Sequence, residues 1–354
     1  HIIAQIWYTD EIRQQKPTPE DEAKWGFAVI EGSLWQALPD FYRELDDLLI
    51  EQCGKSLPLN AKPFRFCSWM GGDRDGNPNV TAKVTQNVIY LGRWMAADLY
   101  LRDLQELINE LSMKPCSEML KTVTSDAIEP YRYLLHQLRS KLKATQAWAS
   151  DALNGKRGID NEPPLSHPHS LIEPLKLCYD SLMSSGMSLI ANGKLLDTLR
   201  RASTFGLTLC PLDIRQESTR HTEVFSELTQ YLNMGDYQEW DEQTRQQFLV
   251  QELQNNRPLL PPNWQPSTNV KEVLDTCKVV ASHSEDCFAS YVISMASQPS
   301  DVLSVALLLK MCGRESPIPI APLFETLDDL TGAAASIQAL LEQPWYQAYN
   351  QGKQ

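Results

Sequence analysis

Short apolar segments that alternate with helical patterns constrain the fold of this sequence more than any other feature. Residues 64–69, 207–214, 291–293 and 318–324 are short and rich in aromatic or aliphatic side chains, so we predict them to be strands. Strands that alternate with helices pair in parallel, so we expect the four segments to be adjacent. Two prolines inside the last segment weaken its assignment, because proline cannot donate a ladder hydrogen bond.

Polar residues follow each of these segments. The sequence DRD comes after residue 69, Ser294 follows the third segment, and Glu325 follows the fourth. In a (β/α) barrel the carboxyl ends of the strands share one mouth, where such enzymes place their chemistry. We therefore predict a mainly α-helical α/β protein that contains about half of a TIM-like β/α barrel with large helical insertions.

The chain divides into four parts on this interpretation. Residues 1–62 form a helical segment that leads into the barrel, and residues 63–80 form the first barrel strand with a glycine-rich turn. Residues 81–169 form a long helical insertion with a Gly- and Pro-rich linker. Residues 170–354 form a helix followed by β/α units that hold three barrel strands.

Composition excludes several classes of protein. With 42% hydrophobic residues in 354 the chain can fill a core, which excludes general disorder. A net charge of −13 argues against nucleic-acid binding, and residues 302–309, the longest apolar run, are too few to cross a membrane.

The eight cysteines form no Cys-x-x-Cys pair, so we expect a reducing, cytoplasmic location. The chain opens at His1 inside an apolar segment, so we expect it to be part of a longer protein.

The sequence GGDRDGNP at residues 71–78 is the most distinctive stretch. An EF-hand does not fit, because Pro78 stands where the obligatory glycine belongs. A phosphate-binding P-loop does not fit either, because Asn77 replaces its lysine. Two interpretations stay open: a tight turn in which Arg74 pairs locally with an aspartate, or a part of the active site.

Arg215 and Glu325 are the candidate site residues at the strand ends. Arg215 lies on the opposite face from Ile214, and its planar fork suits a phosphate or a carboxylate. The alternative is a structural ion pair with a neighbouring acid. Glu325 can ligate a hard divalent cation through oxygen. We interpret Asp328 and Asp329 as solvated acids in the first turn of a helix, where they favour the helix dipole.

The histidines give weaker signals. His167 and His169 lie in the linker without a third ligand, so we interpret them as surface residues rather than as a metal site. For His221, beside Arg220 at a helix start, we expect an ordinary solvated position.

Several long stretches of this sequence, in the same order, resemble phosphoenolpyruvate carboxylase of the bacterial type. They are residues 66–81, 212–222, 291–296, 299–302 and 322–330. The resemblance covers essentially the whole chain, which is identified as a central fragment of a member of this family.

The resemblance implies an activity and a set of site residues. The activity is the conversion of phosphoenolpyruvate and bicarbonate to oxaloacetate and phosphate, with Mg²⁺ or Mn²⁺ as the cofactor. Arg215 resembles a contact to the substrate phosphate, Glu325 resembles a metal ligand, and Arg74 resembles an arginine that lines the active site. The family is tetrameric and is commonly regulated by aspartate or malate and by acetyl-CoA.

The resemblance also implies that the fragment lacks catalytic residues of its own. The family's histidine lies upstream, and its second metal-binding aspartate, its lysine and its glycine-rich loop lie beyond Gln354. We therefore expect the chain alone to be inactive and to bind Mg²⁺ weakly. Two alternatives are a non-catalytic helical assembly module that uses residues 84–111, and another barrel enzyme that acts on phosphoenolpyruvate or pyruvate.

Overall fold

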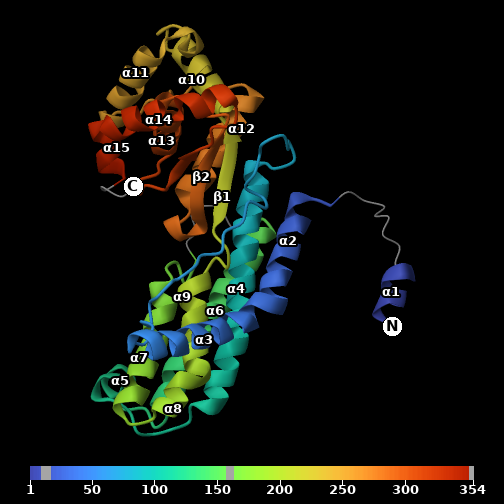
Figure 1. Ribbon diagram of the computed structural model, residues 1–354, viewed down its shortest axis with the longest axis vertical. Coiled ribbons are helices and arrows are strands. Elements are labelled where there is room, and N and C mark those ends of the chain that lie inside the picture. Colours follow the sequence, from blue (N-terminus) through green and yellow to red (C-terminus); the bar gives the residue numbers. More distant parts are fainter. Residues whose placement is uncertain (9–16, 157–162, 351–354) are drawn as a thin grey trace.

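The computed structural model describes residues 1–8, 17–156 and 163–350. Helices dominate the described residues, as the sequence predicts, and the strands form one small sheet. Figure 1 shows an elongated molecule in which a helical region, containing α3 to α9, adjoins a region that contains the strands and α10 to α15. No helix among the described residues combines the length and the apolar character that crossing a membrane requires.

The helical region precedes the sheet in the sequence. The helices before the sheet are α1 (Ile2–Tyr8), α2 (Pro19–Val29), α3 (Trp35–Cys53), α4 (Ala82–Glu110), α5 (Glu118–Val123), α6 (Pro130–Leu153), α7 (His169–Ser184), α8 (Ser188–Ile190) and α9 (Leu196–Phe205). Two π-helical turns, Ile30–Leu34 and Ala191–Leu195, join α2 to α3 and α8 to α9.

The strand-containing region follows. Its elements are β1 (Leu212–Glu217), α10 (Ser218–Tyr231), α11 (Glu242–Gln254), α12 (Thr268–Ser282), β2 (Phe288–Ser294), α13 (Pro299–Met311), β3 (Ile320–Pro322), α14 (Leu327–Glu342) and α15 (Pro344–Tyr349), with 3₁₀ turns at Tyr237–Glu239 and Glu285–Cys287.

Local sequence signals account for several helix ends. The Thr18 hydroxyl accepts a hydrogen bond from the backbone N–H of Asp21, and the Asp21 carboxylate accepts one from the Thr18 backbone N–H, which forms a capping box at α2. Thr81 caps the long helix α4 through the backbone N–H of Val84, at 3.3 Å. Helix α3 ends at Gly54, whose φ of 66° closes the helix at low cost.

The long helix α4 is a core element. It lies side by side with α6, and its residues Tyr100, Leu104 and Leu107 are fully buried. A helix whose apolar side chains are already covered within its own chain contributes to folding stability, by about 1.5–3 kcal/mol for each large apolar side chain.

The sheet has three parallel strands in the order β1-β2-β3. Ile214 pairs with Tyr291, and Ile293 pairs with Pro322. The prediction of adjacent parallel strands is therefore confirmed for these three. Strand β3 is short, as its prolines indicated, because Pro322 has no N–H to donate.

The first predicted strand, residues 64–69, is not a strand. Ser68 nevertheless lies beside β1 in parallel: its N–H donates to the carbonyl of Pro211 at 2.9 Å, and its carbonyl accepts from the N–H of Asp213 at 2.8 Å. The ladder stops there because the chain turns at once, with the N–H of Gly72 donating to the carbonyl of Trp69 at 2.8 Å. Pairing resumes at a second isolated bridge between Asp73 and Arg215.

The predicted strand at residues 207–214 is displaced along the chain. Gly206 and Leu209 have φ values of 57° and 63°, so the backbone turns twice before β1 begins at Leu212. Arg215 therefore lies inside β1 rather than after its end.

The two faces of the sheet differ in burial. On one face Ile214, Tyr291 and Ile293 are fully buried on the side of α10, α12 and α13, which pack against one another. On the other face Asp213, Arg215 and Val292 are partly exposed. The described strands therefore form an open sheet with one buried face.

Candidate functional site

Arg215 lies at the centre of a group of carboxylates at the carboxyl end of the sheet. Its Nη2 atom is 2.8 Å from Oδ2 of Asp75 and 3.2 Å from Oε1 of Glu325. Its Nε atom is 3.9 Å from Oδ1 of Asp73. The structure thus brings Arg215 and Glu325 together from β1 and from the segment after β3, 110 residues apart in sequence.

Backbone pairing next to β1 explains why Arg74 is not in this group. The N–H of Arg215 donates to the carbonyl of Gly72 at 2.9 Å, and the N–H of Arg74 donates to the carbonyl of Arg215 at 3.0 Å. Because register partners share a face and successive side chains alternate, Asp73 shares a face with Arg215. The Arg74 side chain extends to the opposite face, where Gln216 also lies.

The glycines of the 71–78 turn are required by close packing. A Cβ atom on Gly72 would lie 2.0 Å from the carbonyl oxygen of Asp213. Gly71 has a φ of 79°, and a Cβ there would lie 2.6 Å from a methyl group of Val88. The interpretation as a tight turn is therefore correct, and the turn holds Asp73 and Asp75 against β1.

Arg74 anchors this turn from behind. It is only 8% exposed, and it donates to the carbonyl of Gly72 at 2.9 Å and to Oγ1 of Thr85 at 2.5 Å. Within the described part of the chain it forms no ion pair, so the interpretation of a local pair between Arg74 and an aspartate is wrong. Burial lowers the pKa of its guanidinium group from the ordinary value, because the charge is removed from water.

Glu325 connects two strand ends. Its Oε2 atom accepts a hydrogen bond from the backbone N–H of Met295 at 2.8 Å, while Oε1 contacts Arg215. Met295 directly follows β2 and has a φ of 54°, in the left-handed region. The next acids behave as first-turn helix residues, because Asp329 forms a capping box with Thr326 at the start of α14 and Asp328 lies in the same turn.

The described residues do not form a complete metal centre. Nowhere in the described ranges do three His, Cys, Asp or Glu side chains gather closely enough to hold an ion. Near Arg215 the donor set consists of carboxylates that already contact a cationic side chain, so a divalent ion would have to displace Arg215 from Glu325. Glu325 can therefore supply one oxygen ligand.

The histidines are not part of this group. His169 is exposed, with Nε2 3.4 Å from Oε1 of Glu173, which agrees with a surface position. The expectation of a solvated His221 is wrong: it is 1% exposed, and its Nε2 lies 3.0 Å from the Tyr291 hydroxyl. Burial lowers the pKa of His221 to about 3. The sequence contained a signal for this, because His221, Val224, Phe225 and Leu228 form one helical stripe.

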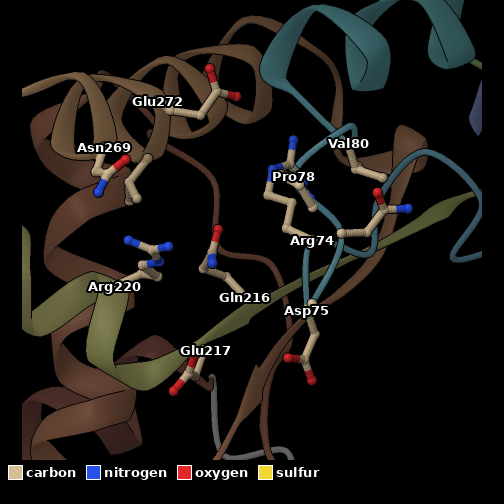
Figure 2. Close-up of a pocket in the computed structure, with 12 residues that line it drawn as sticks. Arg74, Asp75, Pro78, Val80, Gln216, Glu217, Arg220, Asn269 and Glu272 are labelled. Atoms are coloured by element: carbon tan, nitrogen blue, oxygen red, sulfur yellow. The ribbon is translucent and has the colours of Figure 1, made fainter.

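A polar cavity of about 470 Å³ lies on the Arg74 side of the turn. Figure 2 shows its labelled side chains, which come from residues 74–80, the end of β1 and the N-terminal parts of α10 and α12. Sequence reasoning did not identify Gln216, Asn269 or Glu272, which line it, because α12 is more than 50 residues from β1 along the chain and its helical pattern gives no sign of the contact.

Arginine and carboxylate side chains that converge at the carboxyl ends of parallel strands are typical of α/β enzymes that handle small anions. The family profile described as phosphoenolpyruvate carboxylase matches residues 1–354. The phosphoenolpyruvate carboxylases of Hahella chejuensis and Marinobacter nauticus are each 57% identical over 353 residues, and that of Escherichia fergusonii is 56% identical over 355 residues. Each alignment covers 100% of this chain and 40% of the relative, so the chain spans less than half the length of these relatives. The chain belongs to the phosphoenolpyruvate carboxylase family.

Proposed function

We propose that this chain is the central part of an enzyme that converts phosphoenolpyruvate and bicarbonate to oxaloacetate and phosphate. One observation carries the proposal: Arg215 and Glu325, which resemble a phosphate contact and a metal ligand, lie 3.2 Å apart at the carboxyl ends of parallel strands. The family membership established above supports the same reaction.

Arg215 is suited to hold the phosphate of the substrate. Its side chain is 31% exposed, and its Nη1 atom makes no hydrogen bond or ion pair to any described residue. Asp75 and Glu325 both hold Nη2, which fixes the orientation of the guanidinium group and leaves Nη1 for a ligand. In the proposed reaction a bicarbonate oxygen attacks the phosphorus atom and the enolate of pyruvate leaves. The resulting carboxyphosphate gives CO₂ and phosphate, and the enolate carbon captures the CO₂.

Glu325 is the proposed ligand for Mg²⁺ or Mn²⁺, with its further ligands coming from water or from residues outside the described set. The ion would supply Lewis-acid stabilisation for the negative charge that develops on the enolate oxygen. Arg74 lies on the other face of β1, so we propose that it affects the substrate only through the turn that carries Asp75.

We further propose that the three strands and residues 64–73 form about half of a β/α barrel, with Arg215 facing its interior. Three observations support this arrangement. The strands are parallel, residues 68 and 73 form bridges with β1, and the polar residues gather at the carboxyl ends of the strands. Cytoplasmic location, a tetramer, and regulation by aspartate or malate and by acetyl-CoA are proposed on the family resemblance alone.

The alternative of a helical assembly module has less support. It would use the apolar side chains of α4 to bind partners, but Tyr100, Leu104 and Leu107 are fully buried within this chain. The test is an assay of oxaloacetate formation by the full-length protein. Activity that depends on bicarbonate supports the proposal, and its absence contradicts it.

An Arg215→Lys variant of the full-length protein tests the site. Lysine keeps the charge but loses the fork, so kcat/KM should fall by about 10- to 100-fold, the equivalent of one charge-assisted hydrogen bond. Arg102→Lys is the matched control, because Arg102 forms exposed ion pairs with Glu31 and Asp98, and it should retain activity. We expect the 354-residue chain alone to show no turnover and to bind Mg²⁺ no tighter than about millimolar.

A further inference from the structure

The cavity behind the glycine-rich turn has an unusual distribution of hydrogen-bonding groups. Arg74 and Gln216 are each 8% exposed and line the cavity from the same face of β1. Arg74 Nε is buried without a hydrogen-bond partner. The side-chain amide of Gln216 makes no hydrogen bond to any residue that the structure describes. A buried polar atom without a partner, such as Arg74 Nε, is rare in folded proteins, because it has given up its hydrogen bonds to water.

Two further donors complete the wall opposite Arg74. Arg220, in the first turn of α10, uses Nη1 to pair with Glu223 at 3.0 Å, which leaves its other nitrogens available. Asn269, in the first turn of α12, has a side-chain amide with no hydrogen bond to the described residues. Figure 2 shows Gln216 between the side chains of Arg220 and Arg74, with Asn269 above them.

The acids of the cavity are directed elsewhere. Asp75 contacts Arg215 on the opposite face of β1, and Figure 2 shows the carboxylates of Asp75 and Glu217 pointing away from Gln216. Glu272 accepts a hydrogen bond from the backbone N–H of Ala82 at the start of α4, where the helix dipole stabilises its charge. The cavity wall therefore offers hydrogen-bond donors from two arginines and from the amides of Gln216 and Asn269.

We propose that this cavity is a second binding site, which takes a small monocarboxylate. Arg74 Nε and the Gln216 amide lie on one face of neighbouring backbone segments, so they offer two donors to the two oxygens of a planar carboxylate. Arg220 and Asn269 face the rest of the ligand. A phosphate dianion fits less well, because it adds charge and a third oxygen in a cavity whose rim carries Glu217 and Glu272.

This site is separate from the proposed substrate site. The alternation of side chains along β1 places Arg215 and Gln216 on opposite faces of the strand. The inference does not depend on the proposed carboxylase reaction, and it can be tested by binding alone.

The experiment is saturation-transfer NMR on the purified protein with lactate as the probe, observed through its methyl group. We expect a Kd on the order of 1–10 mM, as befits a small ligand. Gln216→Leu keeps the approximate shape and removes the donor, so lactate should bind at least about tenfold more weakly. Arg215→Lys is the control and should bind lactate as the unmodified protein does. Thermal unfolding should show that both variants are folded.

Three outcomes would overturn the proposal. They are no lactate signal up to about 50 mM, binding that survives in Gln216→Leu but is lost in Arg215→Lys, and competition by inorganic phosphate that equals competition by acetate. If Gln216→Leu does not fold, Arg220→Gln at the cavity mouth replaces it, and binding unchanged in that variant would contradict the site.

Discussion

Arg215 and Arg74 lie on backbone segments that are hydrogen-bonded to each other, yet their surroundings differ completely. Arg215 is 31% exposed and shares its charge with Asp73, Asp75 and Glu325. Arg74 is 8% exposed and donates to a carbonyl and a hydroxyl, and it forms no ion pair with a carboxylate of the described residues. An arginine such as Arg215, whose acidic partners can be replaced by a ligand, can bind an anion. An arginine such as Arg74, which is held by neutral buried groups, stabilises the backbone around it.

An ion pair in the helical region shows what a structural arginine looks like when it does have a carboxylate. Arg201 and Asp103 are 10% and 12% exposed at the side chain, with Nη1 of Arg201 2.9 Å from Oδ2 of Asp103. Arg201 Nε also donates to the carbonyl of Trp35 at 2.6 Å. Here both partners are buried with fixed geometry, unlike the partly exposed group around Arg215.

The largest expected effect comes from breaking the turn that separates the two arginines. Gly72→Ala places a methyl group 2.0 Å from the carbonyl oxygen of Asp213, so the turn must move away from β1. We expect a loss of about 3 kcal/mol in the free energy of unfolding, measured by urea denaturation. Gly332→Ala in α14, where a Cβ has open space, is the control and should stabilise slightly. Equal effects of the two substitutions would contradict the packing argument.

The buried face of the sheet should produce a pH dependence of stability through His221. The pKa of His221 is about 3 in the folded protein, whereas an unperturbed histidine, as in the unfolded chain, has a pKa of 6.5. As the pH falls, the unfolded chain therefore binds a proton before the folded protein does. The contribution of His221 to the free energy of unfolding is fully present above pH 6.5. It decreases by about 2.5 kcal/mol when the pH is lowered to 4.5.

His221→Gln removes the titrating group and retains a hydrogen-bonding partner for Tyr291. Urea denaturation at several pH values should show a smaller decrease for this variant, whereas His136→Gln, at an exposed histidine, should decrease as the unmodified protein does. Parallel curves for His221→Gln and the unmodified protein would exclude this residue as the source.

Asp75 should influence activity through Arg215. Asp75→Asn removes the charge that holds Nη2 at 2.8 Å, so in the full-length protein KM for phosphoenolpyruvate should rise by about tenfold, equivalent to about 1.4 kcal/mol. In the Arg215→Lys background the same change should have little further effect, because the interaction is already lost. Additive effects of the two substitutions would show that Asp75 does not act through Arg215.

The smallest effect on activity is expected from loosening Arg74. Thr85→Val removes the hydroxyl that accepts from Arg74 and donates to the carbonyl of Gly71 at 2.6 Å. The free energy of unfolding should decrease by about 1–2 kcal/mol, and kcat/KM of the full-length protein should change less than about twofold. Thr122→Val, at an exposed hydroxyl in α5, is the control. A kinetic loss comparable with that of Arg215→Lys would place Arg74 in direct contact with the substrate.

Much of the fold follows from local patterns in the sequence. The helical insertion expected at residues 81–169 contains the long helices α4 and α6, because capping residues and apolar spacing act within a few residues. Strands β1 to β3 were recognisable for the same reason. The predicted strand at 64–69 was wrong, because its pairing depends on a turn at Gly72 packed against a residue far along the chain.

The sequence by itself determined the helices, the parallel strands and the type of residue at their ends, since alternation and helical spacing are properties of neighbouring residues. Only the tertiary structure decided which face each arginine occupies. Pairing of residues 72–74 with Arg215 fixes the register, and a shift of one residue would exchange the faces of Arg74 and Asp75. The group around Arg215 and the cavity beside Gln216 are therefore consequences of long-range backbone hydrogen bonds that no local pattern encodes.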